Sequence, residues 1–161
     1  MSAPDWFQIR LSRPEDRAEI VQIAQRITEF GLPPWRDVQK ALAWHDGATE
    51  DIFKETEPGD STFVAAAHNG GLLGFVTLRT NRDFQTGEEQ GYVSDFAVTQ
   101  AAEGRGVAQA LMSAAEDWAR TRGFRCLALD VFAMNTRARA FYARFGFAEQ
   151  NLKLVKVLDP Q

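Results

Sequence analysis

The segment from Tyr92 to Phe132 constrains the fold more than any other, because it contains an amphipathic helix that starts directly after an apolar strand and a glycine-containing turn. Strand-like residues run from Tyr92 to Val98 before the turn and from Cys126 to Phe132 after the helix. Gly123 ends the helix just after two cations that suit its negative end. A strand, a helix and a strand in this order predict two parallel strands joined by a right-handed crossover. The apolar residues at helical spacing are Val107, Ala110, Leu111, Ala114 and Trp118.

The residues before this unit predict strands that run in opposite directions. Two apolar runs, Thr62 to Ala67 and Leu72 to Leu78, flank Asn69-Gly70-Gly71, which is a strong hairpin signal. The stretch from Arg79 to Gly91 is polar and contains glycine, so we expect it to be a loop. The hairpin therefore predicts adjacent antiparallel strands.

The amino-terminal residues predict one strand and two helices. Trp6 to Arg10 alternates, and Ser12 with Glu15 resembles a capping box. Apolar residues then recur at helical spacing until Gly31, and a second helix is predicted from Asp37 to Phe53. The apolar residues of the first helix are Ile20, Ile23, Ile27 and Phe30.

The carboxy-terminal residues predict a helix from about Asn135 to Phe145, ended by Gly146, and one or two strands from Ala148 to Leu158. The expected fold is therefore α/β (α+β), with a mixed, mostly antiparallel central sheet of six to seven strands and about four helices on both faces. We expect residues 1–161 to form a single domain, because this length is close to that of a typical domain.

Composition excludes several classes of protein. The 18 basic and 22 acidic residues give a net charge of −4, which argues against nucleic-acid and anionic-membrane partners. The one cysteine, Cys126, lies in a predicted strand among Phe124, Leu127 and Leu129, so we expect a buried thiol and no internal disulfide. Met1 to Arg10 lacks the pattern of a signal peptide, and we expect a cytoplasmic location. No spacing of histidine, cysteine or carboxylate suggests a metal site.

The turn before the long helix has the features of an anion site. Its glycines, Gly104 and Gly106, let a ligand approach the backbone where the helix dipole and free N–H groups favour negative charge. A helix start that needs glycine only for the turn is the structural alternative. A dinucleotide fingerprint would need glycine at Gln109, and the Gly-Lys-Ser/Thr of a P-loop is absent, so both of those readings are disfavoured.

The residues of this turn resemble the pyrophosphate-binding motif of the GCN5-related N-acetyltransferases, which is Q/R-x-x-G-x-G/A. The resemblance extends through the strand, asparagine and closing helix that follow, and it covers about residues 62–150. Residues 1–60 match the family only in the number of helices, which usually shape the acceptor pocket. The matching residues are Glu103-Gly104-Arg105-Gly106-Val107-Ala108, then Leu129 to Asn135, Ala138, Phe141-Tyr142 and Gly146-Phe147.

The resemblance implies a role for each matching residue. Acetyl-CoA would bind as co-substrate through residues Glu103 to Ala108 and Asn135, although Asn135 could instead cap its helix. A bulge would free the backbone of Phe96, Ala97 and Val98 to pair with the pantetheine arm and to stabilise charge on the reacting carbonyl. Tyr142 matches a position that often protonates the leaving thiolate, with core packing as its structural alternative.

The first motif position departs from the family, because Glu103 stands where glutamine or arginine is usual. A carboxylate beside a pyrophosphate should repel it by roughly 1 kcal/mol if solvent screens the pair. Arg105 is the residue expected to offset this repulsion. We therefore expect Glu103→Gln to leave cofactor affinity equal or tighter.

The predicted reaction is direct acetyl transfer to a primary amine, and deprotonating a lysine-like amine at pH 7 costs about 4.6 kcal/mol. Asp95 is the first candidate to orient the amine or relay its proton, with Glu88 and Glu89 as loop alternatives. The acidic balance favours a small cationic acceptor, with Trp35, Trp44 and Phe84 as aromatic candidates for its pocket.

Several alternatives stay open from the sequence alone. The acceptor could be a protein lysine or amino terminus, and the chain could instead sense acyl-CoA without turnover. A dinucleotide oxidoreductase is a third class, disfavoured by Gln109. A homodimer is an open possibility for the assembly.

Overall fold

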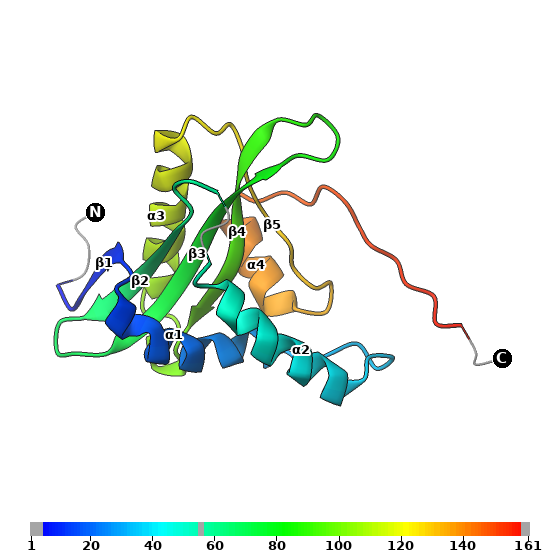
Figure 1. Cartoon of the computed structure of the whole chain (residues 1–161), viewed down its shortest axis with the longest axis horizontal. Coiled ribbons are helices and arrows are strands. Elements are labelled where there is room, and N and C mark those ends of the chain that lie inside the picture. Colours follow the sequence, from blue (N-terminus) through cyan, green and yellow to red (C-terminus); the bar gives the residue numbers. More distant parts are fainter. Residues whose placement is uncertain (1–4, 55–56, 159–161) are drawn as a thin grey trace.

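The computed structural model describes residues 5–54 and 57–158, apart from the side chains of residues 45, 46 and 48. It contains one five-stranded sheet, whose strands follow their sequence order from β1 to β5 (Figure 1). The first four strands are antiparallel neighbours, and β4 and β5 are parallel. The strands are β1 (Phe7–Leu11), β2 (Ser61–Ala67), β3 (Leu72–Arg82), β4 (Glu89–Val98) and β5 (Leu127–Leu129).

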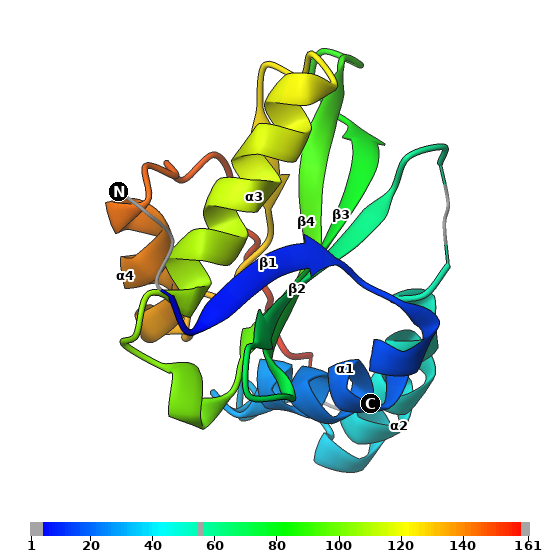
Figure 2. The ribbon, with the colours of Figure 1, turned by 90° about the vertical axis from the view of Figure 1, so that its left-hand side faces the viewer.

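Helices cover both faces of the sheet, as expected from the sequence (Figure 2). One face carries α1 (Arg17–Ala24), the 3-10 turn η2 (Gln25–Thr28) and α2 (Val38–Asp51), and the other carries α3 (Val107–Thr121) and α4 (Thr136–Arg144). The other two 3-10 turns are η1 (Pro14–Asp16) and η3 (Gln100–Ala102).

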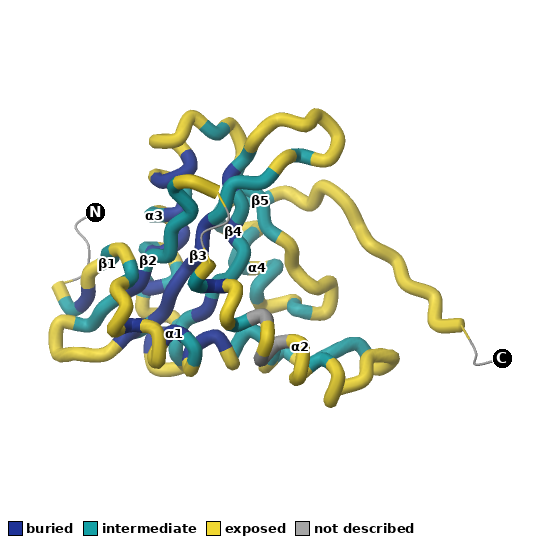
Figure 3. Tube along the Cα trace, viewed as in Figure 1, coloured by how far each residue is buried: buried dark blue, intermediate teal, exposed yellow. Residues whose placement is uncertain are grey.

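The core is divided by the sheet into two clusters of buried side chains (Figure 3). The larger one joins α3 to the strands, where Val107, Leu111 and Met112 are fully buried against Val76 and Leu78. The smaller one joins α1 to the opposite face through Ile20, Ile23, Val64, Phe75 and Ala97. The end of β4 and the start of α3 are therefore both anchored in the core.

The hairpin and the crossover were predicted correctly. Gly70 and Gly71 turn the chain at φ of 103° and 81°, and the N–H of Ala67 donates to the carbonyl of Gly71 at 3.0 Å. The crossover helix begins at Val107 as predicted and is followed by a parallel strand.

Four local expectations were wrong. The predicted loop from Arg79 to Gly91 is mostly strand, and only residues 83–88 connect β3 to β4. The predicted carboxy-terminal strand does not pair: residues 148–158 are exposed and carry no regular structure, so the described sheet has five strands rather than six to seven. Cys126 is exposed rather than buried, because β5 is only three residues long.

The predicted capping box is also displaced by one residue. The N–H of Ser12 donates to the carbonyl of Thr62 at 2.8 Å, so Ser12 still pairs with the strand edge. The cap instead joins the N–H of Arg13 to the carboxylate of Asp16 at 2.7 Å.

Every helix in the described part of the chain is too short or too polar to span a membrane. The same residues contain no group of three or more histidine, cysteine or carboxylate side chains that could hold a metal ion.

Candidate functional site

Strand β4 separates from β5 halfway along its length. The two strands pair only from Gly91 to Val93, while β4 continues to Val98. The pairing of β4 with β3 shifts register at Ser94, which marks a bulge. From Ser94 to Val98 the strand therefore has β3 on one side and no strand of the described sheet on the other.

The turn from η3 to α3 presents backbone to open space. Gly104 and Gly106 have φ of 70° and 85°, a region that favours glycine, and a Cβ on either would meet nothing within 4 Å. Gly106 is the N-cap of α3 and has no side chain to occupy the first-turn N–H groups. A left-handed turn, an uncapped helix start and open space fit a bound diphosphate.

Glu103 forms two ion pairs that tie the turn to distant segments. Its carboxylate lies 2.7 Å from the guanidinium of Arg26 on η2 and 2.7 Å from that of Arg137 on α4. Hydrogen bonds from Arg137 and Arg26 lower the pKa of Glu103, so it is charged at neutral pH. The negative charge expected to repel a phosphate is therefore neutralised within the protein.

The expected partner of Glu103, Arg105, is engaged elsewhere. Its guanidinium lies 3.8 Å from the centre of the Trp6 ring, in a cation-π contact with the segment before β1. Neither Arg26 nor Arg137 was predicted as a partner of Glu103. The residues around them in the sequence do not indicate this role, which arises only because η2 and α4 pack beside the turn.

Arg26 also contacts the end of β4. It donates to the carbonyl oxygen of Val98 at 2.9 Å and to the carboxylate of Glu29 at 3.0 Å, and its side chain is 21% exposed. The carbonyl of Val98, expected to face the pantetheine arm, therefore already accepts one hydrogen bond. A single guanidinium thus joins η2, the end of β4 and the turn before α3.

The hydroxyl of Tyr92 binds one carboxylate, and the charge of a second carboxylate acts on it. The Tyr92 hydroxyl donates to Asp130, just after β5, at 2.7 Å. Burial and this hydrogen bond raise the pKa of Tyr92, and the charge of Asp95 adds to the rise. Asp95 accepts a hydrogen bond from Ser94 at 2.7 Å. Asp130, which the sequence analysis did not single out, thus joins Asp95 in one acidic region beside the point where the strands separate.

Tyr142 packs against the part of β4 that lies beyond the bulge. Its ring centre is 6.3 Å from that of Phe96 and 5.7 Å from that of Phe147. Burial raises the pKa of Tyr142 to about 12, so its hydroxyl keeps its proton at neutral pH. The apolar packing expected of this residue is present, and it places the phenol on the free part of β4.

Asn135 caps α4. Its side-chain oxygen accepts a hydrogen bond from the N–H of Ala138 at 3.1 Å. Of the two roles expected for Asn135, cofactor binding and helix capping, the structure shows the second.

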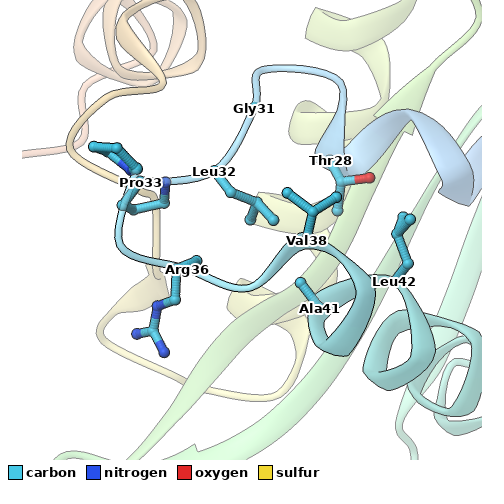
Figure 4. A pocket seen from close by; sticks show the side chains of 9 residues that line it. Thr28, Gly31, Leu32, Pro33, Arg36, Val38, Ala41 and Leu42 are labelled. Carbon is cyan, nitrogen blue, oxygen red and sulfur yellow. The ribbon is translucent and has the colours of Figure 1, made fainter. Parts of the chain in front are cut away.

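A cavity of about 270 Å³ lies between η2 and α2 (Figure 4). The segment that lines it contacts the loop after Asp130, since the rings of Phe30 and Phe132 lie 5.3 Å apart. The cavity is therefore lined by the helical segment expected to shape an acceptor pocket. Its lining is mostly apolar and comprises Thr28, Gly31, Leu32, Pro33, Pro34, Arg36, Val38, Ala41 and Leu42.

The remaining sequence candidates lie outside the lining of the cavity. Glu89 pairs with Arg82 at 2.9 Å at the opposite end of β4 from Val98, and Glu88 lies in the adjoining loop. The aromatic candidates are 48%, 76% and 73% exposed, and none of them lines the cavity. These aromatic residues are Trp35, Trp44 and Phe84.

Comparison with known proteins gives a consistent match over most of the chain. Residues 18–147 match the model of the acetyltransferase (GNAT) family. The chain is 28% identical over 144 residues to an aminoglycoside N(6')-acetyltransferase type 1 of Stenotrophomonas maltophilia, covering 88% of this chain and 86% of that protein.

Solved structures share the fold. A putative acetyl transferase from Pyrococcus furiosus superposes with a TM-score of 0.79 at 24% identity, over 94% of this chain and 99% of that one. An aminoglycoside N-acetyltransferase solved in complex with CoA superposes with a TM-score of 0.70 at 21% identity, over 94% of each chain.

Proposed function

The chain belongs to the acetyltransferase (GNAT) family, and we propose that it transfers the acetyl group of acetyl-CoA directly to a primary amine of a small cationic molecule. The observation that carries this proposal is the acidic region formed by Asp95 and Asp130 around Tyr92, at the point where β4 and β5 separate. The aminoglycoside acetyltransferase relative supports an acceptor that carries several amines.

The turn before α3 would hold the diphosphate of the cofactor. Gly104 and Gly106 provide the open backbone, and Val107 and Ala108 provide N–H groups in the first turn of α3. Arg137 lies beside this turn with its side chain 73% exposed, so it can also reach an anion there. When bound, acetyl-CoA supplies the acetyl group as a thioester.

The free edge of β4 would position the reacting end of the cofactor. Backbone groups of Phe96, Ala97 and Val98 lie beyond the bulge, where β5 no longer pairs. An N–H group on this edge can stabilise negative charge on a carbonyl oxygen without any contribution from a side chain.

The acidic region would bind and orient the acceptor. A protonated amine of the acceptor is attracted to Asp130, which places a second amine of the same molecule near Asp95 and the free edge of β4. Asp95 then accepts the proton that this second amine loses as its nitrogen bonds to the acetyl carbon, and passes the proton to solvent. The apolar cavity between η2 and α2 would accommodate an uncharged part of the acceptor.

Tyr142 would act as the general acid. Its hydroxyl remains protonated at neutral pH because burial raises its pKa to about 12, and it packs beside Phe96 on the free part of β4. It can therefore protonate the thiolate sulfur that leaves when the thioester C–S bond breaks, and it regains its proton from solvent. In this arrangement α1, η2 and α2 would shape one side of the acceptor pocket, and residues 62–150 would provide the cofactor turn, the free edge of β4 and both carboxylates.

The proposal is tested by measuring thiol release from acetyl-CoA with a panel of amines. The panel contains an aminoglycoside, a linear polyamine, a lysine-containing peptide and a peptide with a free amino terminus. We expect turnover with the first two. Turnover confined to the peptides would replace the small acceptor by a protein, and CoA binding without turnover of any amine would favour a sensor.

A further inference from the structure

The cavity between η2 and α2 is walled by apolar side chains. Those of Leu32 and Val38 approach each other across it, and Ala41 lies beside them (Figure 4). Val38 is 55% exposed, so part of this apolar wall is open to solvent. Among the described residues of the lining, Arg36 alone is charged, and its guanidinium points away from Leu32 and Val38 (Figure 4). An open hollow with such walls favours an apolar ligand group.

The same walls offer few hydrogen bonds to a ligand. Thr28 has the one side-chain hydroxyl of the described lining, and this hydroxyl already donates to the carbonyl of Gln25 at 3.3 Å. Pro33 and Pro34 have no N–H group to donate. A ligand hydroxyl that enters the cavity would therefore lose hydrogen bonds to water and regain few of them, which costs free energy. A hydrocarbon group of the same size has no such cost.

The loop after β5 joins the cavity to the acidic region. Asp130 begins this loop, and two residues later the ring of Phe132 lies 5.3 Å from that of Phe30. The terminal methyl group of Met134 lies 4.0 Å from the place that a Cβ on Gly31 would take, and Gly31 lines the cavity. The loop that carries the carboxylate of Asp130 therefore also packs against the segment that lines the apolar cavity.

We propose that the preferred acceptor is an amphipathic amine. It has a protonated amine that binds Asp130, a primary amine that reacts, and a hydrocarbon group of about six to ten carbons that fills the cavity. This inference rests on the proposed function and narrows its acceptor to an amine with an apolar group. A dry cavity of about 150 Å³ holds a benzene molecule, and the volume here is about 270 Å³. An acceptor rich in hydroxyls can still bind through Asp130, but it leaves the cavity to water.

The first test is a series of N-alkyl-1,3-diaminopropanes, which share one primary and one secondary amine and differ only in the length of the alkyl group. Calorimetry in the presence of CoA measures their binding without turnover, and thiol release from acetyl-CoA measures KM. From methyl to hexyl, we expect the affinity to rise about two- to fourfold for each added CH₂ and KM to fall in parallel. The rise should end at about ten carbons, when the cavity is full. The compound with a glucityl group, which has as many carbons as hexyl but carries hydroxyls, should bind no better than the methyl compound.

Two matched variants on α2 locate the apolar group. Ala41→Phe puts a ring into the cavity, so it should reduce the affinity for the hexyl compound to that for the methyl compound and leave the latter nearly unchanged. Ala43→Phe adds the same ring at an exposed position outside the lining, and it should behave like the wild type. Val38→Asp is a second way to oppose an apolar group, at an exposed position of the wall. Melting curves show whether each variant is folded.

Equal affinity of the wild type for the methyl, hexyl and glucityl compounds would overturn the inference, and the proposed function would stand if all three are acetylated. A preference for hexyl that survives both Ala41→Phe and Val38→Asp would also overturn it, because the apolar group would then bind outside the cavity. Failure of the proposed function gives a different result, namely no thiol release with any of these amines although CoA binds. The calorimetric series still tests the cavity in that case, because it depends on binding alone.

Discussion

Arg26 and Glu103 are 77 residues apart in the chain, yet the guanidinium of one lies 2.7 Å from the carboxylate of the other. Arg26 belongs to the helical segment that borders the apolar cavity, and Glu103 belongs to the turn before α3. The same guanidinium donates to the carbonyl of Val98. This contact therefore fixes the position of the turn relative to the end of β4.

Replacing Arg26 by alanine should weaken CoA binding by about tenfold, because charge-assisted hydrogen bonds to Glu103 and Val98 are lost together. The carboxylate of Glu103 would then keep only the exposed Arg137 as a partner. Calorimetric titration with CoA measures the effect. Arg144→Ala, at the exposed end of α4, is the control and should bind CoA like the wild type. Equal affinity of Arg26→Ala and the control would show that the contact does not shape the cofactor turn.

Replacing Glu103 by glutamine should leave CoA affinity within roughly twofold or make it tighter. Glutamine keeps an oxygen that can accept from Arg26 and Arg137, while the negative charge beside the expected diphosphate disappears. Calorimetric titration with CoA measures the affinity of this variant. A clear loss of affinity would mean that the charge of Glu103 is needed to hold the two guanidinium groups.

Replacing Tyr142 by phenylalanine should lower kcat by about ten- to a hundredfold and leave KM for both substrates nearly unchanged. The ring contacts with Phe96 and Phe147 are retained, and only the hydroxyl is lost. Steady-state kinetics and a melting curve separate a catalytic effect from a structural one. An unchanged kcat would exclude Tyr142 as the general acid.

Replacing Asp130 by asparagine should raise KM for a cationic amine by about tenfold, while Asp95→Asn should lower kcat. The first removes a charge that binds the acceptor, and the second removes the proposed proton relay. Glu89→Gln is the matched control, because Glu89 lies on the same strand but pairs with Arg82 at its opposite end. If Asp130→Asn raises the KM of a neutral amine equally, charge recognition is not its role.

Replacing Asp16 by asparagine should reduce the free energy of unfolding by about 1–3 kcal/mol at pH 7. Asp16 is buried and binds Arg10 at 2.6 and 2.9 Å. The hydrogen bond from Arg10 lowers its pKa in the folded state, so its contribution is complete above the unfolded pKa of about 3.9 and is lost as the pH falls through the folded value.

Urea unfolding at pH 7 and at pH 3 tests this pH dependence. The difference in the free energy of unfolding between the wild type and Asp16→Asn should be smaller at pH 3. Glu15→Gln, at an exposed neighbouring position, should unfold like the wild type at both values. If the difference in the free energy of unfolding is larger at pH 3 than at pH 7, the ionised form of Asp16 is not the one that stabilises the fold.

Local patterns predicted the elements whose sequence signal is itself local. The helix from Val107 has a complete apolar stripe, and the hairpin has two glycines at positive φ, so both were predicted correctly. The end of β3 was missed because its residues are polar. The structure shows why it is still a strand: residues Arg79 to Arg82 pair with residues Glu89 to Tyr92 of β4.

Contacts between distant segments could not be predicted in the same way. Tyr92 and Asp130 are 38 residues apart, and they meet only because β4 and β5 are parallel neighbours. The turn proposed to bind the cofactor was predicted from its glycines and the residues around them, whereas the partners of Glu103 lie on η2 and α4. Sequence patterns thus located the segments of the candidate site, and packing determined which side chains complete it.

The early separation of β4 from β5 has a consequence for how this protein tolerates change. In the proposed function, the free edge of β4 contacts the cofactor through N–H and carbonyl groups, so Phe96, Ala97 and Val98 would be constrained mainly by the core that they fill. Such an edge keeps its function under extensive substitution, with proline as the exception because it removes the N–H donor. Recognition of the cofactor can therefore persist while the residues around the acceptor diverge.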